Sequence, residues 1–331
     1  MKAGVTGATG FLGSNLVRLL LEQGHQVRVV RRERSNRMLL EGLDAEEHVG
    51  DIRNPDSLRG AFQGCDVVFH TAANVAVFGA RRDRQQATNV DGTRNVLEAC
   101  LEHGVSRVVY TSSIAAIGLP EEGRLADETS PYNWGPYDMS YMETKRQAEA
   151  EVHRFVARGL DVVIVNPANI FGPGDIHFHL GGLLIAVQRG RVSAVPAGGF
   201  TVCHVGDVAQ GHLAAAERGR TGERYILGGE NLTFREIVQT VAEVVGARPP
   251  RFTIPNLLLP VGGLAMEGLS LLTGKPPLLT RRSATLAGRH LYYSSARAES
   301  ELGYHITPFR ESVRQAFDWY VVNGMMQSRT A

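Results

Sequence analysis

Eight residues near the N-terminus indicate the fold: Thr6-Gly7-Ala8-Thr9-Gly10-Phe11-Leu12-Gly13 (TGATGFLG), between an apolar run at 2–6 and an amphipathic stretch at 11–23. In this GxxGxxG spacing, Gly7 permits a tight turn, Gly10 lets a phosphate group approach the backbone, and Gly13 allows the helix to pack closely on the strand. The amides of Phe11 and Leu12 would face the phosphates, where the helix dipole favours negative charge. The motif therefore predicts a dinucleotide-binding turn.

Short runs rich in Val and Ile alternate with amphipathic stretches in the first half of the chain. The predicted strands are 2–6, 27–30, 48–50, 66–70, 107–111 and 161–165. The predicted helices are 11–23, 56–62, 93–102 and 141–157, with one more, containing Leu and Met, after the second strand. This pattern is typical of parallel strands covered on both faces. We therefore expect an α/β fold with a doubly wound parallel (Rossmann) sheet and right-handed crossovers.

Segments rich in Gly and Pro at 171–182 and 195–200 interrupt this alternation and predict loops around a cleft. Beyond them we expect a strand at 201–205, helices at 207–218 and 309–322, and short elements that include 232–245. We therefore expect residues 1–166, with a return segment near 201–218, to form a dinucleotide-binding Rossmann domain. Residues 167–200 and 219–331 would form a smaller, mostly helical substrate-binding lobe.

The composition excludes several classes of protein. The 331 residues carry a formal net charge of +1, which gives no reason to expect a nucleic-acid partner. Cys65, Cys100 and Cys203 have no metal-ligand spacing and predict buried free thiols in a reducing cytoplasm. The apolar segment Asn256–Thr273 contains Pro and Glu, so we expect a pocket lid or a buried helix rather than a membrane span.

Tyr141 and Lys145 are four residues apart in a predicted helix, so their side chains share one face. Reduction of a carbonyl needs a proton for the forming alkoxide, and a phenol with a pKa near 10 is a poor acid–base group at neutral pH. A fixed ammonium group one turn away stabilises phenolate and lowers the phenol's pKa. The pair is therefore predicted to act as the acid–base pair.

Further motifs accompany the glycine turn: His70-Thr71-Ala72-Ala73, Asn89-Val90-Asp91-Gly92-Thr93 and Tyr141-x-x-x-Lys145. Together they resemble the extended short-chain dehydrogenase/reductases of the NAD-dependent epimerase/dehydratase superfamily. Within it, the chain resembles the dihydroflavonol reductase branch, and most of all the bacterial hopanoid-associated sugar epimerase/reductase group. The resemblance covers nearly the whole chain and implies an enzyme that binds a nicotinamide dinucleotide and transfers a hydride. It also implies a homodimer.

The resemblance implies that cofactor contacts come from the glycine turn and from the ends of later strands. The implied cofactor-binding residues are Gly7, Thr9, Gly10, Phe11, Leu12, Gly13, Arg31, Arg32, Asp51, Ile52, Ala72, Ala73, Tyr141, Lys145 and Pro167. Asp51 and Ile52 would lie beside the adenine, although Asp51 could instead be a turn or cap residue before Asn54. Asn89 would steady the central sheet without a catalytic role.

The same resemblance implies a third catalytic residue. Ser113, at the end of the strand 107–111, would bind the substrate carbonyl oxygen and orient Tyr141, with Ser112 as the alternative. Lys145 would also hold the nicotinamide ribose. Asn169 and Ile170 would border the substrate.

The residues after Ser113 help to choose between activities. Ile114-Ala115-Ala116 have no proton to move, whereas related dehydratases place an Asp-Glu pair there. The sugar-epimerase motif usually ends in Val-Tyr-Gly, and here Ala116-Ile117-Gly118 stand instead. We expect an NADP(H)-dependent reductase of a carbonyl compound or a dehydrogenase of a secondary alcohol. A nucleotide-sugar epimerase that uses its cofactor transiently is the alternative, and an NADP-binding regulatory protein without turnover is a remote one.

The end of the second strand bears on the choice of cofactor. NAD selectivity in Rossmann folds usually comes from a carboxylate at this position, which binds the ribose 2′-hydroxyl. Arg31 stands there and Arg32 follows it, and a guanidinium group can bind a 2′-phosphate. We therefore expect a preference for NADP(H), with NAD(H) possible, and rank Arg32 before Arg31. A solvated turn in which Glu33 reaches the ribose is the alternative.

Two clusters of polar residues remain. His177 and His179, with Asp175, lie in a Gly-flanked loop without a third ligand at metal spacing, so we expect a loop over the substrate and no metal site. His204 and Asp207 are expected to shape the fold, with Asp207 as a helix N-cap.

Overall fold

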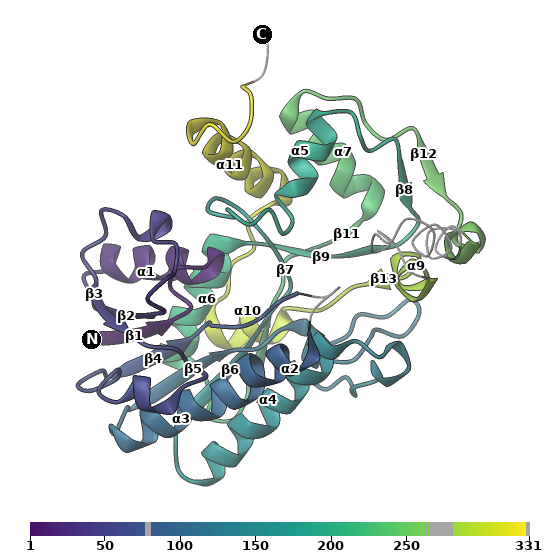
Figure 1. Ribbon diagram of the computed structural model, residues 1–331. Helices are drawn as coiled ribbons and strands as arrows, with labels where there is room; N and C mark the ends of the chain where they lie inside the picture. Colours follow the sequence, from purple (N-terminus) through teal and green to yellow (C-terminus); the bar gives the residue numbers. More distant parts are fainter. Residues whose placement is uncertain (77–80, 262–263, 265–280, 329–331) are drawn as a thin grey trace.

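The centre of the computed structural model, which describes residues 1–76, 81–261, 264 and 281–328, is a seven-stranded parallel sheet (Figure 1). The strand order is β10-β6-β5-β4-β1-β2-β3. The strands are β1 (Lys2–Thr6), β2 (Gln26–Arg31), β3 (Glu46–Val49), β4 (Val67–His70), β5 (Arg107–Thr111), β6 (Val162–Pro167) and β10 (Arg224–Leu227). Helices cover both faces, so the predicted α/β fold with a doubly wound sheet is confirmed.

Each face of the sheet has its own apolar core. One face packs against α1 (Phe11–Glu22), α6 (Val205–Arg218) and α10 (Ala296–Leu302). The other face packs against α3 (Gly92–Glu102) and α4 (Ser140–Ala157). A short helix, α2 (Arg82–Gln85), leads through the π-helical turn η3 (Gln86–Asp91) into α3. Because both faces are buried, the strands consist of nearly continuous apolar residues, as the sequence pattern predicted.

Two predicted helices are wrong. The stretch after β2 and the stretch at 56–62 contain only the 3-10 turns η1 (Met38–Leu40) and η2 (Pro55–Leu58). Gly42 and Gly60 follow these turns with φ of +76° and +75°, a left-handed conformation that ends a helix. Two more 3-10 turns lie near the carboxyl edge of the sheet, η4 (Ile114–Ala116) and η5 (Gly135–Tyr137).

The remaining elements form a smaller part beyond the carboxyl edge of the central sheet (Figure 1). In one small sheet β11 (Glu230–Thr233), β13 (His290–Leu291) and β7 (Asn169–Phe171) all pair with β9 (Gly199–His204). β8 (Ala194–Pro196) pairs with β12 (Phe252–Ile254). The helices are α5 (Gly182–Gln188), α7 (Phe234–Val245), α9 (Arg281–Ala287) and α11 (Phe309–Val322), and the turn η6 (Asn256–Leu258) follows β12. The predicted helix at 309–322 is confirmed residue for residue.

Strand membership differs from the prediction at two places. β10, from the segment that the sequence analysis assigned to the smaller lobe, is the edge strand of the central sheet and pairs with β6. The predicted strand at 201–205 is β9, which belongs to the small sheet, while the following helix α6 packs on the central one. These pairings are made by residues far apart in the sequence, so periodicity could not specify them.

The segment Asn256–Thr273 lies partly outside the described residues. In its described part, Leu259 is buried but Leu257 is 84% exposed, so η6 is not a buried helix. No helix within the described ranges is long and apolar enough to cross a bilayer. Cys65, Cys100 and Cys203 are free and buried, as predicted.

Two histidines are buried between the sheet and its helices. The ring nitrogens of His70 lie 2.7 and 3.1 Å from the hydroxyl groups of Thr6 and Thr93, and His212 donates from Nδ1 to the carbonyl oxygen of Val208. Burial lowers the pKa of His70 to about 3 and that of His212 to about 4, from an ordinary value of 6.5. Both rings are therefore neutral in the folded protein at neutral pH.

These histidines predict a loss of stability in weak acid. Below pH 6.5 the unfolded chain binds protons that the folded chain does not. The unfolding free energy therefore decreases as the pH is lowered, until His212 titrates near 4 and His70 near 3. Two such groups give a slope of up to about 2.7 kcal/mol per pH unit. Urea unfolding between pH 6.5 and 5, above the range of ordinary carboxylates, measures it. An unfolding free energy that stays constant over this window would contradict the prediction, and the exposed-residue variant His290→Gln should leave the slope unchanged.

Candidate active site

The predicted site residues gather at the carboxyl edge of the central sheet. The glycine turn follows β1, Arg32 follows β2, Asp51 follows β3, Ala72 follows β4 and Ser113 follows β5. In open α/β sheets this edge is where ligands bind. The topology therefore brings together residues from five separate stretches of sequence.

The glycine turn fits a pyrophosphate. Gly7 has φ of +71°, and a Cβ on Gly13 would lie 2.2 Å from the carbonyl oxygen of Gly7, so neither position accepts a side chain. Gly10 is the N-cap of α1, no side chain caps this end, and the first turn carries no acidic residue. A Cβ on Gly10 would meet no atom closer than 3.2 Å, which leaves space over the first amides of the helix. These amides and the helix dipole are suited to bind an anion.

The end of β4 is fixed against this turn. Thr71 donates from its hydroxyl to the carbonyl oxygen of Thr6 (2.7 Å), and the backbone amide of Ala72 lies 3.4 Å from the Thr6 hydroxyl. Asn89 is buried and holds the loop after β4 to α4, because it donates to both the carbonyl of Asn74 and the hydroxyl of Thr144. Asn89 thus has structural contacts, and Ala72 lies next to Gly7 of the glycine turn, while contacts of Ala72 and Ala73 with the cofactor stay predictions.

The structure separates the two arginines at the end of β2. Arg31 donates to the carboxylate of Glu47 from Nε (2.8 Å) and Nη2 (2.6 Å), and its Nη1 binds the carbonyl oxygens of Arg32 and Glu33. Its guanidinium is therefore engaged within the protein. Arg32 and Glu33 are exposed. Of the two arginines, Arg32 is the one whose side chain is presented to solvent.

Asp51 is part of a turn as well as a neighbour of Arg32. Its carbonyl oxygen accepts from the amide of Asn54, which caps η2, and its carboxylate accepts from Arg53. The bond from Arg53, and to a smaller extent the charge of Arg32, lower the pKa of the Asp51 carboxyl. Ile52 is buried in the core. Asp51 thus has the contacts of a turn residue, which was the alternative interpretation, and its contact with adenine stays a prediction.

The predicted acid–base residues are brought together on β5 and α4. Tyr141 and Lys145 are both buried, and the Ser113 hydroxyl forms a hydrogen bond with the Tyr141 phenol. Lys145 Nζ donates to the carbonyl oxygen of Thr111 (2.8 Å) and lies 5.2 Å from the centre of the Tyr110 ring. Ser113, rather than Ser112, therefore contacts the phenol.

The expectation that Lys145 lowers the pKa of Tyr141 is wrong. Burial raises the pKa of Tyr141 above its ordinary value, and the bond from Ser113 opposes this. The Lys145 ammonium, which was expected to lower that pKa, binds a backbone carbonyl, and burial lowers its own pKa to about 8, against the opposing charge of Glu149. The phenol is thus held in its protonated form.

Apolar side chains surround Tyr141. Trp134 donates from its indole nitrogen to the carbonyl of Ile117 (2.7 Å), which fixes its ring in this cluster. Leu286 of α9 and Leu291 of β13 contribute from the smaller part of the molecule. We call this cluster the apolar wall, and its members are Ala115, Leu119, Tyr132, Trp134, Tyr137, Met139, Tyr141, Met142, Leu286 and Leu291.

Other predicted substrate and cofactor residues lie near the junction of the two parts. Pro167 ends β6, and Asn169 and Ile170 belong to β7. Asn169 donates to the carbonyl of Thr201 (3.0 Å), and Ile170 packs on the core of the central sheet. Their side chains thus have structural contacts, and their roles toward ligands stay predictions.

The loop that contains Asp175, His177 and His179 is held by contacts with its own backbone. The carboxylate of Asp175 accepts from the amides of His179, Leu180 and Gly181. No group of three or more His, Cys, Asp or Glu residues among those described could hold a metal ion.

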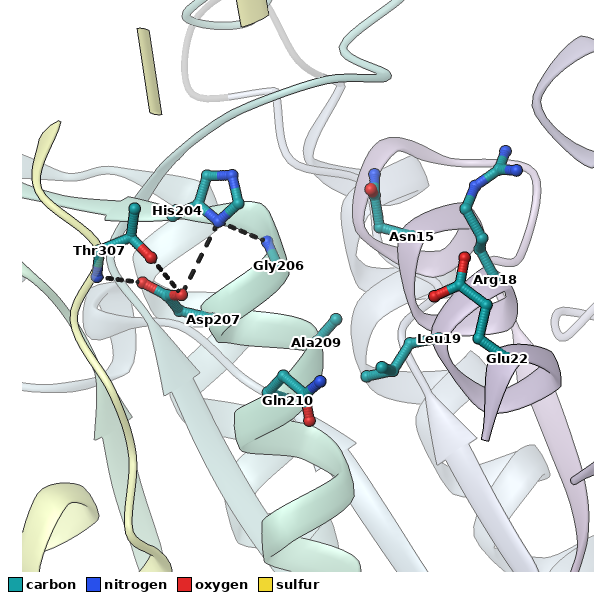
Figure 2. A pocket seen from close by; sticks show the side chains of 10 residues that line it. All are labelled: Asn15, Arg18, Leu19, Glu22, His204, Gly206, Asp207, Ala209, Gln210 and Thr307. Atoms are coloured by element: carbon teal, nitrogen blue, oxygen red, sulfur yellow. Dashed lines mark hydrogen bonds and ion pairs between the residues drawn. The ribbon is translucent and has the colours of Figure 1, made fainter. Parts of the chain in front are cut away.

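The predicted N-cap at Asp207 is wrong, because α6 begins two residues earlier, at Val205. His204 is the cap, its Nδ1 accepting from the amide of Gly206 (3.2 Å). Asp207 instead accepts from the amide (2.6 Å) and the hydroxyl (2.8 Å) of Thr307, at the edge of a pocket between α1 and α6 (Figure 2).

Sequence reasoning missed two buried residues behind the acid–base pair, Glu149 and Asn166. Asn166 donates to the carbonyl oxygen of Ser113 (2.9 Å) and to the carboxylate of Glu149 (2.8 Å). The signal was available for Glu149: a carboxylate four residues after Lys145 falls on the buried face of the helix.

The Rossmann sheet and the glycine turn define an NAD(P)-dependent enzyme of the extended short-chain dehydrogenase/reductase type. The chain belongs to the NAD dependent epimerase/dehydratase family, whose model matches residues 3–228. This confirms the resemblance that the motifs indicated.

Individual relatives cover almost the whole chain. It is 36% identical over 330 residues to a protein of Synechocystis sp. named as a candidate dihydroflavonol 4-reductase, covering 98% of this chain and 96% of the relative. It is 37% identical over 336 residues to the sterol demethylase protein B of Methylococcus capsulatus, covering 97% and 99%. The crystal structure of the protein gox2253 is 38% identical, with a TM-score of 0.88 and coverage of 98% and 99%.

Proposed function

We propose that this protein is an NADP(H)-dependent reductase that converts a ketone or aldehyde on an apolar molecule into the alcohol, or catalyses the reverse oxidation. The observation that carries the proposal is the contact between Ser113 and Tyr141 within the apolar wall. Relatives named for a dihydroflavonol and a sterol support an apolar substrate.

Each residue has a defined task in this proposal. A bound nicotinamide supplies the hydride to the carbonyl carbon, or accepts it in the reverse direction. Ser113 donates a hydrogen bond to the oxygen on which negative charge develops. Tyr141 gives that oxygen a proton, and because burial raises its pKa the phenol is protonated at neutral pH and has this proton to give. Lys145 places a positive charge beside this proton transfer.

The surroundings of Tyr141 favour simple reduction over elimination or epimerisation. Ile114, Ala115 and Ala116 follow Ser113 and carry no second acid or base. The rival activity is epimerisation of a nucleotide sugar with a cofactor that is retained.

Turnover of NADPH with a panel of apolar ketones, aldehydes and nucleotide sugars tests the proposal. The expected result is one NADPH consumed for each alcohol formed, with the cofactor exchanging in every cycle. A protein that purifies with tightly held dinucleotide and converts a nucleotide sugar without net NADPH consumption would contradict it. A homodimer and a cytoplasmic location remain predictions of the family resemblance.

The cofactor preference gives a separate prediction. Arg32→Ala should weaken NADPH binding about tenfold or more, because one charge-assisted hydrogen bond contributes about 1.5–3 kcal/mol. NADH binding should hardly change. Arg31→Ala should have a smaller effect on the ratio of the two affinities, since Arg31 already binds Glu47.

Fluorescence titration of both cofactors measures these affinities. Arg34→Ala is the matched control, because it removes the same charge from an exposed position two residues away. Equal affinity of the wild type for NADPH and NADH would defeat the preference, and an equal loss in the Arg34 variant would show that the effect is only one of net charge.

A further inference from the structure

A carboxylate is buried one helical turn beyond the acid–base pair. Glu149 and Lys145 are four residues apart on α4, with exposures of only 5% and 2%. The charge of Glu149 acts on two groups: it raises the pKa of Lys145 against burial, and it raises that of Tyr110, over whose ring Lys145 Nζ lies. A buried ammonium group is unfavourable unless an opposite charge compensates it.

The carboxylate is held from its other side by two elements of the sheet. Its Oε1 accepts from Nδ2 of Asn166 on β6 (2.8 Å), which also binds the carbonyl oxygen of Ser113 (2.9 Å). Its Oε2 accepts from Nη1 of Arg224 on β10 (3.3 Å). Glu149 is therefore connected to Lys145 by charge and to the backbone of Ser113 through one amide.

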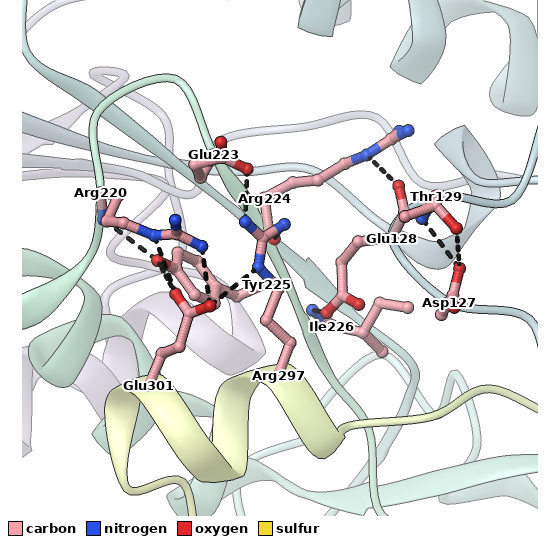
Figure 3. A network of polar contacts seen from close by, with 10 residues as sticks. All are labelled: Asp127, Glu128, Thr129, Arg220, Glu223, Arg224, Tyr225, Ile226, Arg297 and Glu301. Carbon is pink, nitrogen blue, oxygen red and sulfur yellow. Dashed lines mark hydrogen bonds and ion pairs between the residues drawn. The ribbon is translucent and has the colours of Figure 1, made fainter.

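Arg224 is itself braced. Figure 3 shows it on β10, where its Nε donates to the carbonyl oxygen of Glu128 (2.9 Å) and its own carbonyl oxygen accepts from Arg297 of α10 (3.2 Å). The Glu128 carboxylate in turn accepts from the amide of Ile226 (2.8 Å). The edge strand thus presents a fixed cation to Glu149.

From these contacts we infer that Glu149 is a positioning residue, which keeps Lys145 charged and fixes Ser113 through Asn166. The kinetic part of this inference rests on the proposed function, and its electrostatic part does not. The groups near Lys145 are His70 on β4 and Tyr110 on β5, with Tyr141 and Glu149 one turn away on α4 and Arg224 bound to Glu149.

Lys145 titrates between pH 6 and 9.5, whereas His70, Tyr110 and Tyr141 do not. The pKa of Lys145 is lowered to about 8 and that of His70 to about 3, whereas burial raises the pKa values of Tyr110 and Tyr141 above their ordinary value. The folded pKa of Lys145 lies below its value of 10.5 in the unfolded chain, so its contribution to the unfolding free energy rises with pH above about 8. Any change in this rise reports the coupling between Lys145 and a substituted neighbour.

The test compares unfolding free energies of cofactor-free variants at pH 6 and pH 9.5. Glu149→Gln lowers the pKa of Lys145 further, by about one unit or more. The difference in unfolding free energy between this variant and the wild type should therefore narrow from pH 6 to pH 9.5, by about 1.4 kcal/mol for a pKa change of one unit. Glu151→Gln is the matched control: Glu151 is also buried on α4 but is paired with Arg94 and Arg154, so its difference from the wild type should stay constant.

A second variant has the opposite sign. Arg224→Gln removes the second cation beside the Glu149 carboxylate, which raises the pKa of Lys145, so the difference in unfolding free energy from the wild type should widen with pH. This variant also decides the question if Glu149→Gln does not fold. A difference that stays constant with pH in these variants would overturn the inference, because a merely structural contact does not titrate with Lys145.

Kinetics give an independent readout. The alkaline limb of kcat/KM should move down by about one pH unit in Glu149→Gln, so that the loss is small at pH 6 and about tenfold above pH 8. A loss of equal size at every pH would contradict the role assigned to Glu149. Absence of NADPH turnover in the wild type would instead refute the proposed function, and the unfolding measurements would still decide on Glu149.

Discussion

Replacement of Tyr141 by phenylalanine is expected to lower kcat by about 10²–10⁴, the usual contribution of general acid catalysis. The ring remains to pack in the apolar wall, so only the hydroxyl that hydrogen-bonds with Ser113 is lost. The Kd for NADPH should stay within a few-fold of the wild type, since the substitution removes proton transfer rather than a binding surface. Single-turnover kinetics with saturating NADPH separate the two effects.

The matched control is Tyr132→Phe. Tyr132 belongs to the same wall, and its hydroxyl donates to Glu143 (3.2 Å), away from the Ser113–Tyr141 contact. This variant should keep most of the activity. A Tyr141→Phe protein that retained more than about a tenth of the wild-type rate would show that another group supplies the proton.

Two glycines of the turn are expected to respond differently to the same added methyl group. Gly10→Ala should fold, because its Cβ would approach only the Gly7 carbonyl oxygen, at 3.2 Å. The methyl group would occupy the space over the first amides of α1, so NADPH should bind about tenfold more weakly or worse. Gly13→Ala should destabilise the fold itself, since its Cβ would lie 2.2 Å from a backbone oxygen and overpacking costs about 1–3 kcal/mol or more.

Paired measurements of NADPH affinity and urea stability separate these outcomes. The stability of Gly10→Ala should stay within about 1 kcal/mol of the wild type, the cost of alanine at an N-cap. Wild-type affinity in this variant would mean that the first turn of α1 does not bind the pyrophosphate. Full stability in Gly13→Ala would contradict the close packing of helix on strand.

The sequence predicted those parts of the site that depend on neighbouring residues. The glycine turn is local, because a strand, three glycines and a helix occupy adjacent positions, and the structure has them as predicted. The pairing of Tyr141 with Lys145 needs only a helix, and α4 supplies it. The central sheet followed from its buried apolar strands for the same reason.

The parts that were wrong or missed depend on contacts between distant segments. β10 joins β6 across some 60 residues of sequence, a pairing that periodicity does not record. Arg31 was a candidate phosphate ligand, but in the folded protein its guanidinium binds Glu47 on β3. Asp207 is not the cap because α6 begins at Val205, and its carboxylate accepts instead from Thr307, 100 residues away. The sequence shows which residues are charged or apolar, but it does not show which distant residues they contact.

In the proposed reaction the protein transfers a hydride from nicotinamide to a carbonyl carbon beside Tyr141. NADPH that carries deuterium at both C4 positions tests it directly, with a ketone that the substrate panel identifies. We expect one deuterium at the carbinol carbon of each alcohol and one NADP⁺ per alcohol, with both formed about 10²–10⁴ times more slowly in Tyr141→Phe. A product without deuterium, formed while the bound cofactor is neither consumed nor exchanged, would contradict it.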